Sequence, residues 1–322
     1  MKKHIVGVFM LVVLSSCTST KHAHLAQQIE RTSCNQQTPY SYSKKDLPIP
    51  FDQLVIDTVL LHHYSYQSLN AANAIGLLDE LHSFMEKRNS YHAGMTLESR
   101  VALLTLVNKI NQKINIASLE ISAFASELDC EEERADQIAS FLKSNEDNRE
   151  QGLIIGSTIV GAVGAIAAEL VANNSANGSL ASVIAIGTSV TEAILGVLML
   201  TNHQKIDFYH QRNILKDIWE APELSSYYSP SIWYYLNYKN PQDKENSLLK
   251  KLVHRWMNLG QIVDQDTKNK EAIYALYFGE GGRYTAEQLK NRAAMLDQVE
   301  ASITLMKQDL KVLSIEFEKY SE

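Results

Sequence analysis

The sequence predicts an all-α protein, an elongated helical bundle or coiled coil with a central apolar helical hairpin. Beyond residue 50, no segment alternates apolar and polar residues convincingly as a strand would. Only six prolines and fourteen glycines interrupt the 322 residues. Two stretches repeat apolar residues every three or four positions. Such segments bury apolar surface as helices, so residues 51–322 are expected to form one helical domain.

The most regular repeat lies between residues 97 and 148. Spacings of four and three residues alternate along it, which keeps these positions on one helix face. They are Leu103, Val107, Ile110, Ile114, Ala117, Ile121, Phe124, Leu128, Glu131, Ala135, Ile138 and Leu142. Glu131 alone is not apolar, and the acidic run 131–133 is interpreted as a solvent-exposed face. The helix would be about 75 Å long. It could continue into the hairpin, because neither Pro nor Gly interrupts the chain before Gly152.

A second heptad helix is predicted over residues 285–320. Thr285 and Gln288 match a capping box, and Tyr284 and Leu289 are placed as its hydrophobic staple. The apolar positions of this helix are Leu296, Val299, Ile303, Met306, Leu310, Leu313, Phe317 and Tyr320. The two heptad helices are expected to pack along each other, although the same faces could join protomers.

The apolar hairpin, residues 152–201, is the centre of the chain. Its two runs, 153–172 and 180–201, flank an uncharged polar loop, and each has the length of about 20 residues that crosses a bilayer. Glu169 and Glu192 are the only charged residues within it. An ionised Glu192, near the middle of the second run, would offset much of the gain from insertion. Membrane insertion and burial as the core of a bundle therefore both stay open.

Small residues recur at every fourth position along both arms of the hairpin. On a helix this spacing lets two backbones approach closely. The candidate residues of the membrane hairpin are Gly156, Gly161, Gly164, Glu169, Ala185, Ser189, Glu192 and Gly196.

Residues 1–17 read as a secretory signal, with a basic start and a short apolar core. They end in Leu14-Ser15-Ser16-Cys17, which resembles the lipobox of bacterial lipoproteins. The resemblance implies cleavage before Cys17 and lipidation of Cys17, and several acyl chains anchor a protein stably. Thr18 stands where an enteric inner-membrane retention signal has Asp. The expected location is therefore the outer membrane, lipid-anchored on its periplasmic or surface face.

Residues 18–50 are polar and contain three prolines, so they are predicted to be a flexible tether. The cysteines other than Cys17 are Cys34 in this tether and Cys130 in the first heptad helix. An oxidising compartment permits a disulfide between them, but the sequence does not decide whether they pair.

No catalytic motif and no metal-binding cysteine pair occurs in the chain, so neither an enzyme nor a cofactor or metal is predicted. His203, Asp207 and His210 would share one face of a helix predicted over residues 202–220, and are interpreted as a polar stripe. The net charge of −7 argues against nucleic acid as a partner. Six of the twelve residues 227–238 are Tyr or Trp. They could sit at a membrane interface or stack on sugars, but packing against the bundle is the simplest interpretation.

In outline, residues 97–220 resemble the α-helical pore-forming toxins of the cytolysin A type. That resemblance implies a hydrophobic segment shielded in the soluble form and released on membrane contact. The lipobox and the helix stop at Pro222 depart from that family, and no functional residue carries over.

The leading hypothesis is a lipid-anchored envelope protein whose hairpin inserts into or associates with a membrane, as a pore-forming oligomer. Its partners would be membrane lipid and either further copies of the chain or a helical protein. The alternative is a periplasmic scaffold or adaptor lipoprotein, with the hairpin buried as core and the heptad faces binding protein partners.

Overall fold

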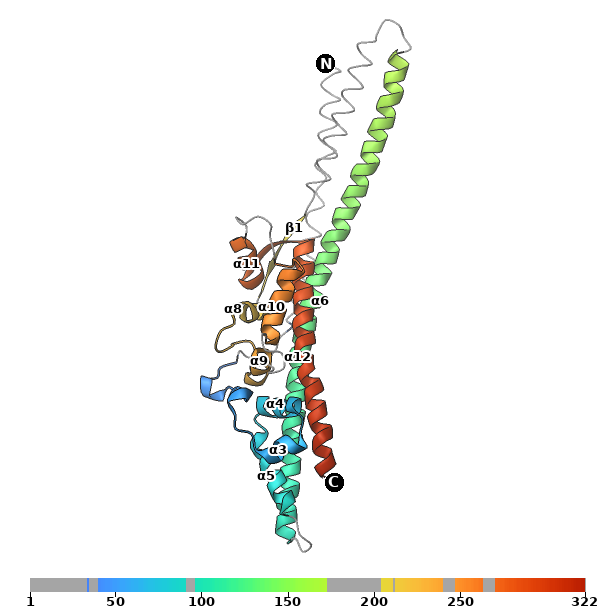
Figure 1. Ribbon diagram of the computed structural model, residues 1–322. Coiled ribbons are helices and arrows are strands. Elements are labelled where there is room, and N and C mark those ends of the chain that lie inside the picture. Colours follow the sequence, from blue (N-terminus) through green and yellow to red (C-terminus); the bar gives the residue numbers. More distant parts are fainter. Residues whose placement is uncertain are drawn as a thin grey trace. The chain divides into compact units, whose positions relative to one another are not determined.

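A computed structural model describes residues 34, 40–90, 96–172, 204–210, 212–239, 247–262 and 270–321; within 153–172, Ile154 is the one described side chain. In these residues the fold is helical apart from one two-stranded sheet, which confirms the all-α prediction (Figure 1). The chain divides into two compact units. Unit 1 comprises Met1–Arg134, Tyr209–Gly281 and Arg292–Glu322, and unit 2 comprises Ala135–Phe208 and Gly282–Asn291.

Two long helices, α6 (Leu97–Ala172) and α12 (Ala286–Ser321), run through both units. The shorter elements of unit 1 are η1 (Lys44–Asp46), η2 (Phe51–Gln53), α3 (Thr58–His63), α4 (Tyr66–Ala74), α5 (Leu78–Asn89), α8 (Ile214–Glu220), α9 (Pro230–Asn237), α10 (Leu248–Asn258) and α11 (Lys270–Phe278). The sheet pairs β1 (Lys205–Tyr209) with β2 (Gly281–Thr285).

Capping residues set where the short helices begin. The Asp57 carboxylate accepts the backbone N–H of Val59 at the start of α3, and the Ser65 hydroxyl accepts that of Ser68 at the start of α4. Ser229 caps α9, with Pro230 at the first helical position. Because these caps and a left-handed Gly76 (φ 61°) interrupt the chain, residues 51–89 form three short α-helices.

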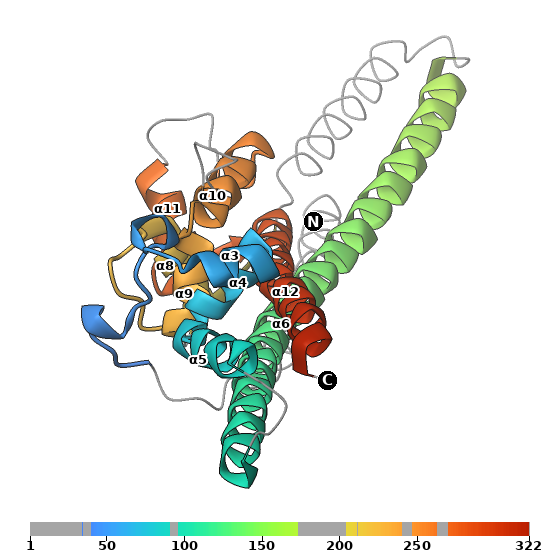
Figure 2. The same cartoon turned by 60° about the horizontal axis from the view of Figure 1, so that its bottom comes forward.

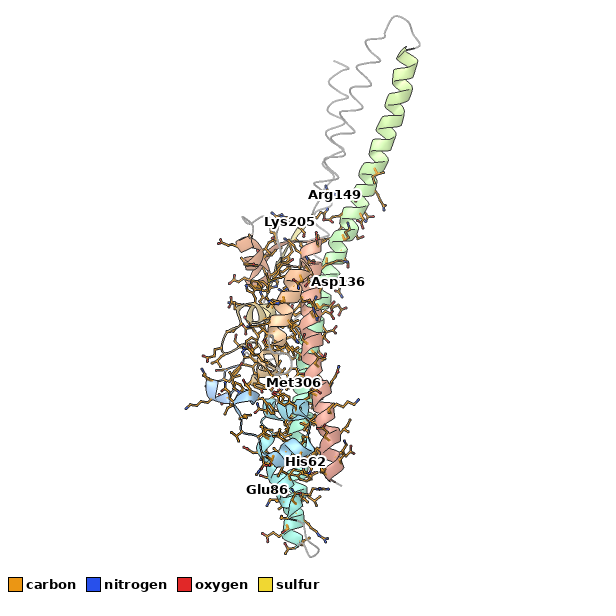
Figure 3. The ribbon with its side chains drawn as sticks, in the orientation of Figure 1. His62, Glu86, Asp136, Arg149, Lys205 and Met306 are labelled. Carbon is orange, nitrogen blue, oxygen red and sulfur yellow. A yellow bond between two sulfur atoms is a disulfide. The ribbon has the colours of Figure 1, made fainter. Side chains whose placement is uncertain are left out.

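The core of unit 1 lies between α6 and α12, which run side by side in both ribbon views (Figures 1 and 2). The heptad positions of α6 from Ile110 to Glu131 and those of α12 from Leu296 to Phe317 are buried. Met306, labelled in Figure 3, is fully buried. The Lys307 ammonium also donates to the Ser122 hydroxyl across this interface at 2.7 Å. The prediction that the two heptad helices pack along each other is confirmed within unit 1.

The capping box predicted for α12 is present in unit 2. The Thr285 N–H donates to the Gln288 side-chain oxygen at 2.9 Å, and the Gln288 N–H donates to the Thr285 hydroxyl at 3.2 Å. The predicted staple residues Tyr284 and Leu289 are both fully buried. A local pattern of four residues therefore predicted the start of this helix correctly.

The prediction of a helix over residues 202–220 is wrong, because residues 205–209 form β1 and only Ile214–Glu220 are helical. Asp207 and His210 consequently do not share a helix face, and His203 lies outside the described residues. Asp207 instead lies 3.9 Å from the Arg283 guanidinium. Among the described residues, no group of three potential ligands could hold a metal ion.

The aromatic segment 227–238 packs against the bundle, as its simplest interpretation predicted. Tyr228, Trp233, Tyr234 and Tyr235 are each at most 7% exposed. The hydroxyl of Tyr228 donates to the Ile214 carbonyl, and that of Tyr234 to the Asn70 side chain. Buried rings with bonded hydroxyls are the expected state of core tyrosines.

Residues 40–50, predicted as the end of a tether, lie against the body. The Tyr40 N–H donates to the Ser226 carbonyl, the Tyr42 hydroxyl accepts the Ser225 N–H, and Lys44 pairs with Glu223. Cys34 forms a disulfide with Cys130 of α6. Tyr40, Tyr42 and Cys34 therefore hold this segment against the folded body, although its polar composition predicted a flexible tether.

Candidate functional site: the root of the apolar hairpin

The part of α6 that leads into the predicted hairpin segment belongs to unit 2, and we call it the root. It is built from α6 residues 135–148, β1, β2 and the first turn of α12. Its buried apolar side chains are Ala135, Ile138, Ala139, Leu142, Phe208, Tyr284, Ala286 and Leu289. The rings of Phe208 and Tyr284 meet edge to face with centroids 5.9 Å apart. The root thus has a small core of its own.

Helix α6 passes through the root without interruption and ends at Ala172. The prediction that the heptad helix continues into the first apolar arm is therefore confirmed for the backbone. Gly156, Gly161, Gly164 and Glu169 all lie on this helix. Among the parts of the chain that the structure describes, no helix combines the length and the apolar character needed to span a membrane.

The chain returns to the root at Gln204. Its backbone N–H donates to the Glu146 carboxylate at 2.8 Å, across a sequence separation of 58 residues. In Figure 3, Arg149 marks α6 just beyond this contact and Lys205 marks the start of β1. The candidate residues Ala185, Ser189, Glu192 and Gly196 fall inside this excursion and lie outside the described residues, as does Cys17. Gln204, where the described chain resumes, is therefore bonded to Glu146, 26 residues before the end of α6 at Ala172.

The surface of the root carries charges of both signs. A cavity of about 730 Å³ is lined by three lysines, Lys143, Lys205 and Lys290, and by two acidic residues, Glu146 and Glu287. Lys143 also pairs with Asp147 at 3.0 Å. Because acids balance the bases here, the root does not present the one-sign polybasic patch that draws proteins to anionic lipid.

A cluster of buried charges lies in unit 1, and we call it the ionic cluster. It consists of Glu127, Glu131 and Arg134 on α6, Arg212 before α8, and Arg292 on α12. Arg134 donates to Glu131 at 2.6 Å, and the Arg212 guanidinium lies 3.3 Å from the Glu127 carboxylate. The prediction that the run 131–133 is solvent-exposed is wrong for Glu131, which is 8% exposed. Its place in the heptad pattern was the one sequence signal of this burial.

Arg292 joins the ionic cluster to the segment before β2. Its guanidinium donates to the side-chain oxygen of Asn213 and to the Tyr277 carbonyl. The Asn213 amide donates in turn to the carbonyls of Tyr277 and Gly279. These bonds tie α12 to the chain before α8 and to the end of α11. Arg292 therefore fixes the backbone at the end of α11, through the Tyr277 carbonyl, as well as the side chain of Asn213.

Burial shifts the titration of several groups in and beside the ionic cluster. It raises the pKa of Glu127 to about 7, with nearby Glu131 acting in the same direction and Arg212 opposing. It raises the pKa of Glu131 as well, against the attraction of Arg134. Burial and the positive Arg292 lower the pKa of His210 to about 2, so this histidine is neutral at physiological pH. Within the ionic cluster, burial therefore favours the protonated form of the Glu127 and Glu131 carboxyl groups.

No protein-family model matches the chain, and comparison with curated proteins and with solved structures found no match. The functional argument therefore rests on the residues and geometry of this chain alone.

Proposed function

We propose that the chain is a lipid-anchored envelope protein of the outer membrane, held by lipid at Cys17, whose apolar hairpin 152–201 inserts into or lies against a membrane as part of a homo-oligomer. The single observation that carries the proposal is the return of Gln204 to Glu146, because it makes the intervening residues one closed excursion from the root.

The length of the excursion agrees with an antiparallel helical hairpin. At about 1.5 Å per residue, α6 rises about 39 Å from Glu146 to Ala172. The roughly 30 residues left before Gln204 suffice for a helical return of that length with a few residues for the turn. Each apolar run is about as long as the 30 Å hydrocarbon core is thick.

The composition of the first arm also favours lipid. Glycine costs about 1 kcal/mol relative to Ala within a helix in water, and α6 carries Gly152, Gly156, Gly161 and Gly164 in succession. Glycine is more frequent in transmembrane helices than in soluble ones, where it allows close helix contacts. Small-residue faces on both arms would let hairpins from several copies pack together, in the manner of the pore-forming toxins that the chain resembles in outline.

A second candidate function rests on a different observation. Leu97, Val101 and Leu104 follow a 4,3 spacing on α6 and are 79%, 54% and 62% exposed. An exposed apolar stripe of this kind can bind a helical partner. The chain would then be a scaffold or adaptor lipoprotein with its hairpin buried as core.

Single-site labelling tests the membrane proposal. The chain has three cysteines, of which Cys34 and Cys130 are joined, so Cys17→Ser together with Ala185→Cys leaves one reactive thiol. An environment-sensitive fluorophore at this thiol should shift to the blue when phosphatidylcholine–phosphatidylethanolamine vesicles are added. The same label at Ser140→Cys, on the exposed face of α6, should not respond.

Three outcomes separate the two functions. A vesicle-dependent shift that lipid-borne quenchers reduce supports the hairpin in the membrane. A label that is already blue-shifted and protected from iodide without vesicles supports the buried-core alternative. Mass spectrometry of the native protein tests the anchor separately, and an N-terminal peptide without lipid on Cys17 would overturn that part of the proposal.

A further inference from the structure

Unit 1 contains a cleft that the membrane proposal does not use. It has a volume of about 420 Å³ and opens between α4, the end of α9, α10 and α12. Helix α9 packs against both α4 and α10, which fixes these walls relative to one another. This volume lies within the roughly 300–1,000 Å³ of small-molecule sites. We call it the tyrosine cleft, after Tyr66, Tyr235 and Tyr238 in its lining.

Two of these rings are held in place by other rings. Phe51 meets Tyr66 edge-on with centroids 4.6 Å apart, and Tyr234 lies 6.0 Å from Tyr238. Tyr66 and Tyr238 are 6.5 Å apart with their planes inclined by 36°. A planar base clamped between two rings would require the planes of those rings to be nearly parallel. The inclined pair instead offers separate ring surfaces, which suit the apolar faces of puckered rings.

Polar groups line the cleft beside the rings. The Asp309 carboxylate accepts the Tyr235 hydroxyl through Oδ2 at 2.6 Å, and its Oδ1 is a further acceptor. The Asn70 side chain is 3% exposed, and its oxygen accepts the Tyr234 hydroxyl at 2.7 Å. The amide nitrogen of the same side chain is a hydrogen-bond donor. Gln67 and Gln308 add two more carboxamides to the lining.

The charges of the cleft cancel. Asp309 contributes one negative charge and Lys251, at the rim, one positive charge. A strongly charged ligand gains little from such a pair, whereas a neutral ligand with many hydroxyl groups can use the carboxylate and the carboxamides together. Rings for apolar faces and paired acceptors and donors for hydroxyls are the two requirements of a sugar-binding site.

We propose that the tyrosine cleft binds a short neutral saccharide, either free or as the end of a longer glycan. Tyr66 and Tyr238 would stack on its ring faces, and Asp309, Asn70 and Gln308 would hold its hydroxyl or acetamido groups. The proposal does not depend on membrane insertion, since the cleft belongs to unit 1 and the root to unit 2.

Isothermal titration calorimetry of the full chain in detergent tests this inference. The probes are maltose, cellobiose and N,N′-diacetylchitobiose, each up to about 10 mM, with adenosine and galacturonic acid as planar and charged comparisons. At least one neutral disaccharide should bind with a submillimolar Kd, equivalent to about −4 kcal/mol or better. Chitohexaose binding with the Kd of the disaccharide would assign the cleft to glycan ends, and weaker binding would assign it to free disaccharides.

Three variants show whether the cleft is responsible. Tyr66→Ala removes a stacking ring and should weaken binding at least tenfold. Gln308→Ala removes one exposed carboxamide, with little risk to folding, and should weaken it about fivefold. Tyr209→Ala, an exposed tyrosine on β1, is the matched control and should bind like the wild type. The inference is overturned if no neutral saccharide binds, if adenosine binds better, or if Tyr66→Ala and Gln308→Ala leave the Kd unchanged.

Discussion

Arg134 donates a 2.6 Å hydrogen bond to the carboxylate of Glu131 one turn earlier on α6, and neither residue is more than 8% exposed. Two charges are therefore removed from water beside the apolar face of α6, where the equivalent positions of the neighbouring heptads hold Phe124 and Ile138. Burying ions costs several kcal/mol each, so such a pair is stable only while every member is present.

Replacement of Glu131 by Ala should destabilise the protein by about 3 to 5 kcal/mol, because the buried Arg134 would lose the carboxylate that accepts its 2.6 Å hydrogen bond. The urea midpoint of the full chain measures this change. Glu133→Ala, two residues away and exposed, is the matched control and should change stability by less than about 0.5 kcal/mol. Equal midpoints for the two variants would contradict the structural importance of the ionic cluster.

Glu127 should make the stability depend on pH. Its pKa is raised by burial from an ordinary 4.5 to about 7, so between these values the native state binds more protons than the unfolded state. Stability from this group is therefore complete below pH 4.5 and falls as the pH rises to 7, by up to about 3 kcal/mol. Glu127→Gln stays neutral in both states and should lose this decline. Urea midpoints measured from pH 4 to 8 compare the two chains, and parallel curves would refute the assignment.

The parts of the fold that sequence predicted well depend on local patterns. The heptad spacing of α6 and α12 and the capping box at Thr285 each involve residues within a few turns, whose geometry any helix reproduces. The sheet was missed because β1 has only five residues and its partner β2 follows about 70 residues later. An alternation over so few positions also fits a helix, until a distant strand satisfies its hydrogen bonds.

The buried charges were missed for a similar reason. Glu131 broke the apolar pattern, but Arg212 and Arg292 come from segments that only the folded chain brings to α6. The pairing of Cys34 with Cys130 was equally undecided by spacing, since it requires their Cα atoms to approach to 5.5 Å. For the predicted hairpin segment, the structure adds that α6 continues without a break to Ala172, and that Gln204 is bonded to Glu146.

Loss of the disulfide should lower stability substantially. Cys34 and Cys130 are 96 residues apart in sequence, and closing a loop of that length restricts the unfolded chain strongly. Cys130→Ser is expected to cost about 2 to 5 kcal/mol, measured as a lower thermal midpoint. Cys17→Ser leaves the disulfide intact and should unfold like the wild type. An unchanged midpoint in Cys130→Ser would mean that the cross-link contributes little.

Two glycines should respond in opposite directions to replacement by alanine. A Cβ at Gly279 would run into the carbonyl oxygen of Ala275, which already accepts the Gly279 N–H at the end of α11. Gly279→Ala should therefore destabilise by about 1 to 3 kcal/mol. A Cβ at Gly152 meets nothing within 4 Å. Gly152→Ala in α6 should stabilise by up to about 1 kcal/mol in urea unfolding, and a loss of stability there would contradict a helix through this position.

Glu192→Leu should strengthen membrane association if the hairpin inserts, because a charged side chain near mid-bilayer costs about 2.5 to 3.5 kcal/mol. In the Cys17→Ser background, which removes the proposed lipid anchor, flotation with neutral vesicles should rise by roughly tenfold or more at pH 7. Flotation of the Glu192→Leu variant should not increase further when the pH is lowered, because the variant has no carboxyl group to protonate at this position. Glu133→Leu adds the same apolar surface to the exposed face of α6 and should float like the wild type. Because the charges at the root balance, 0.5 M salt should leave flotation unchanged. Flotation that does not rise in Glu192→Leu, together with a lower urea midpoint, would place Glu192 in a paired, buried core and favour the scaffold function.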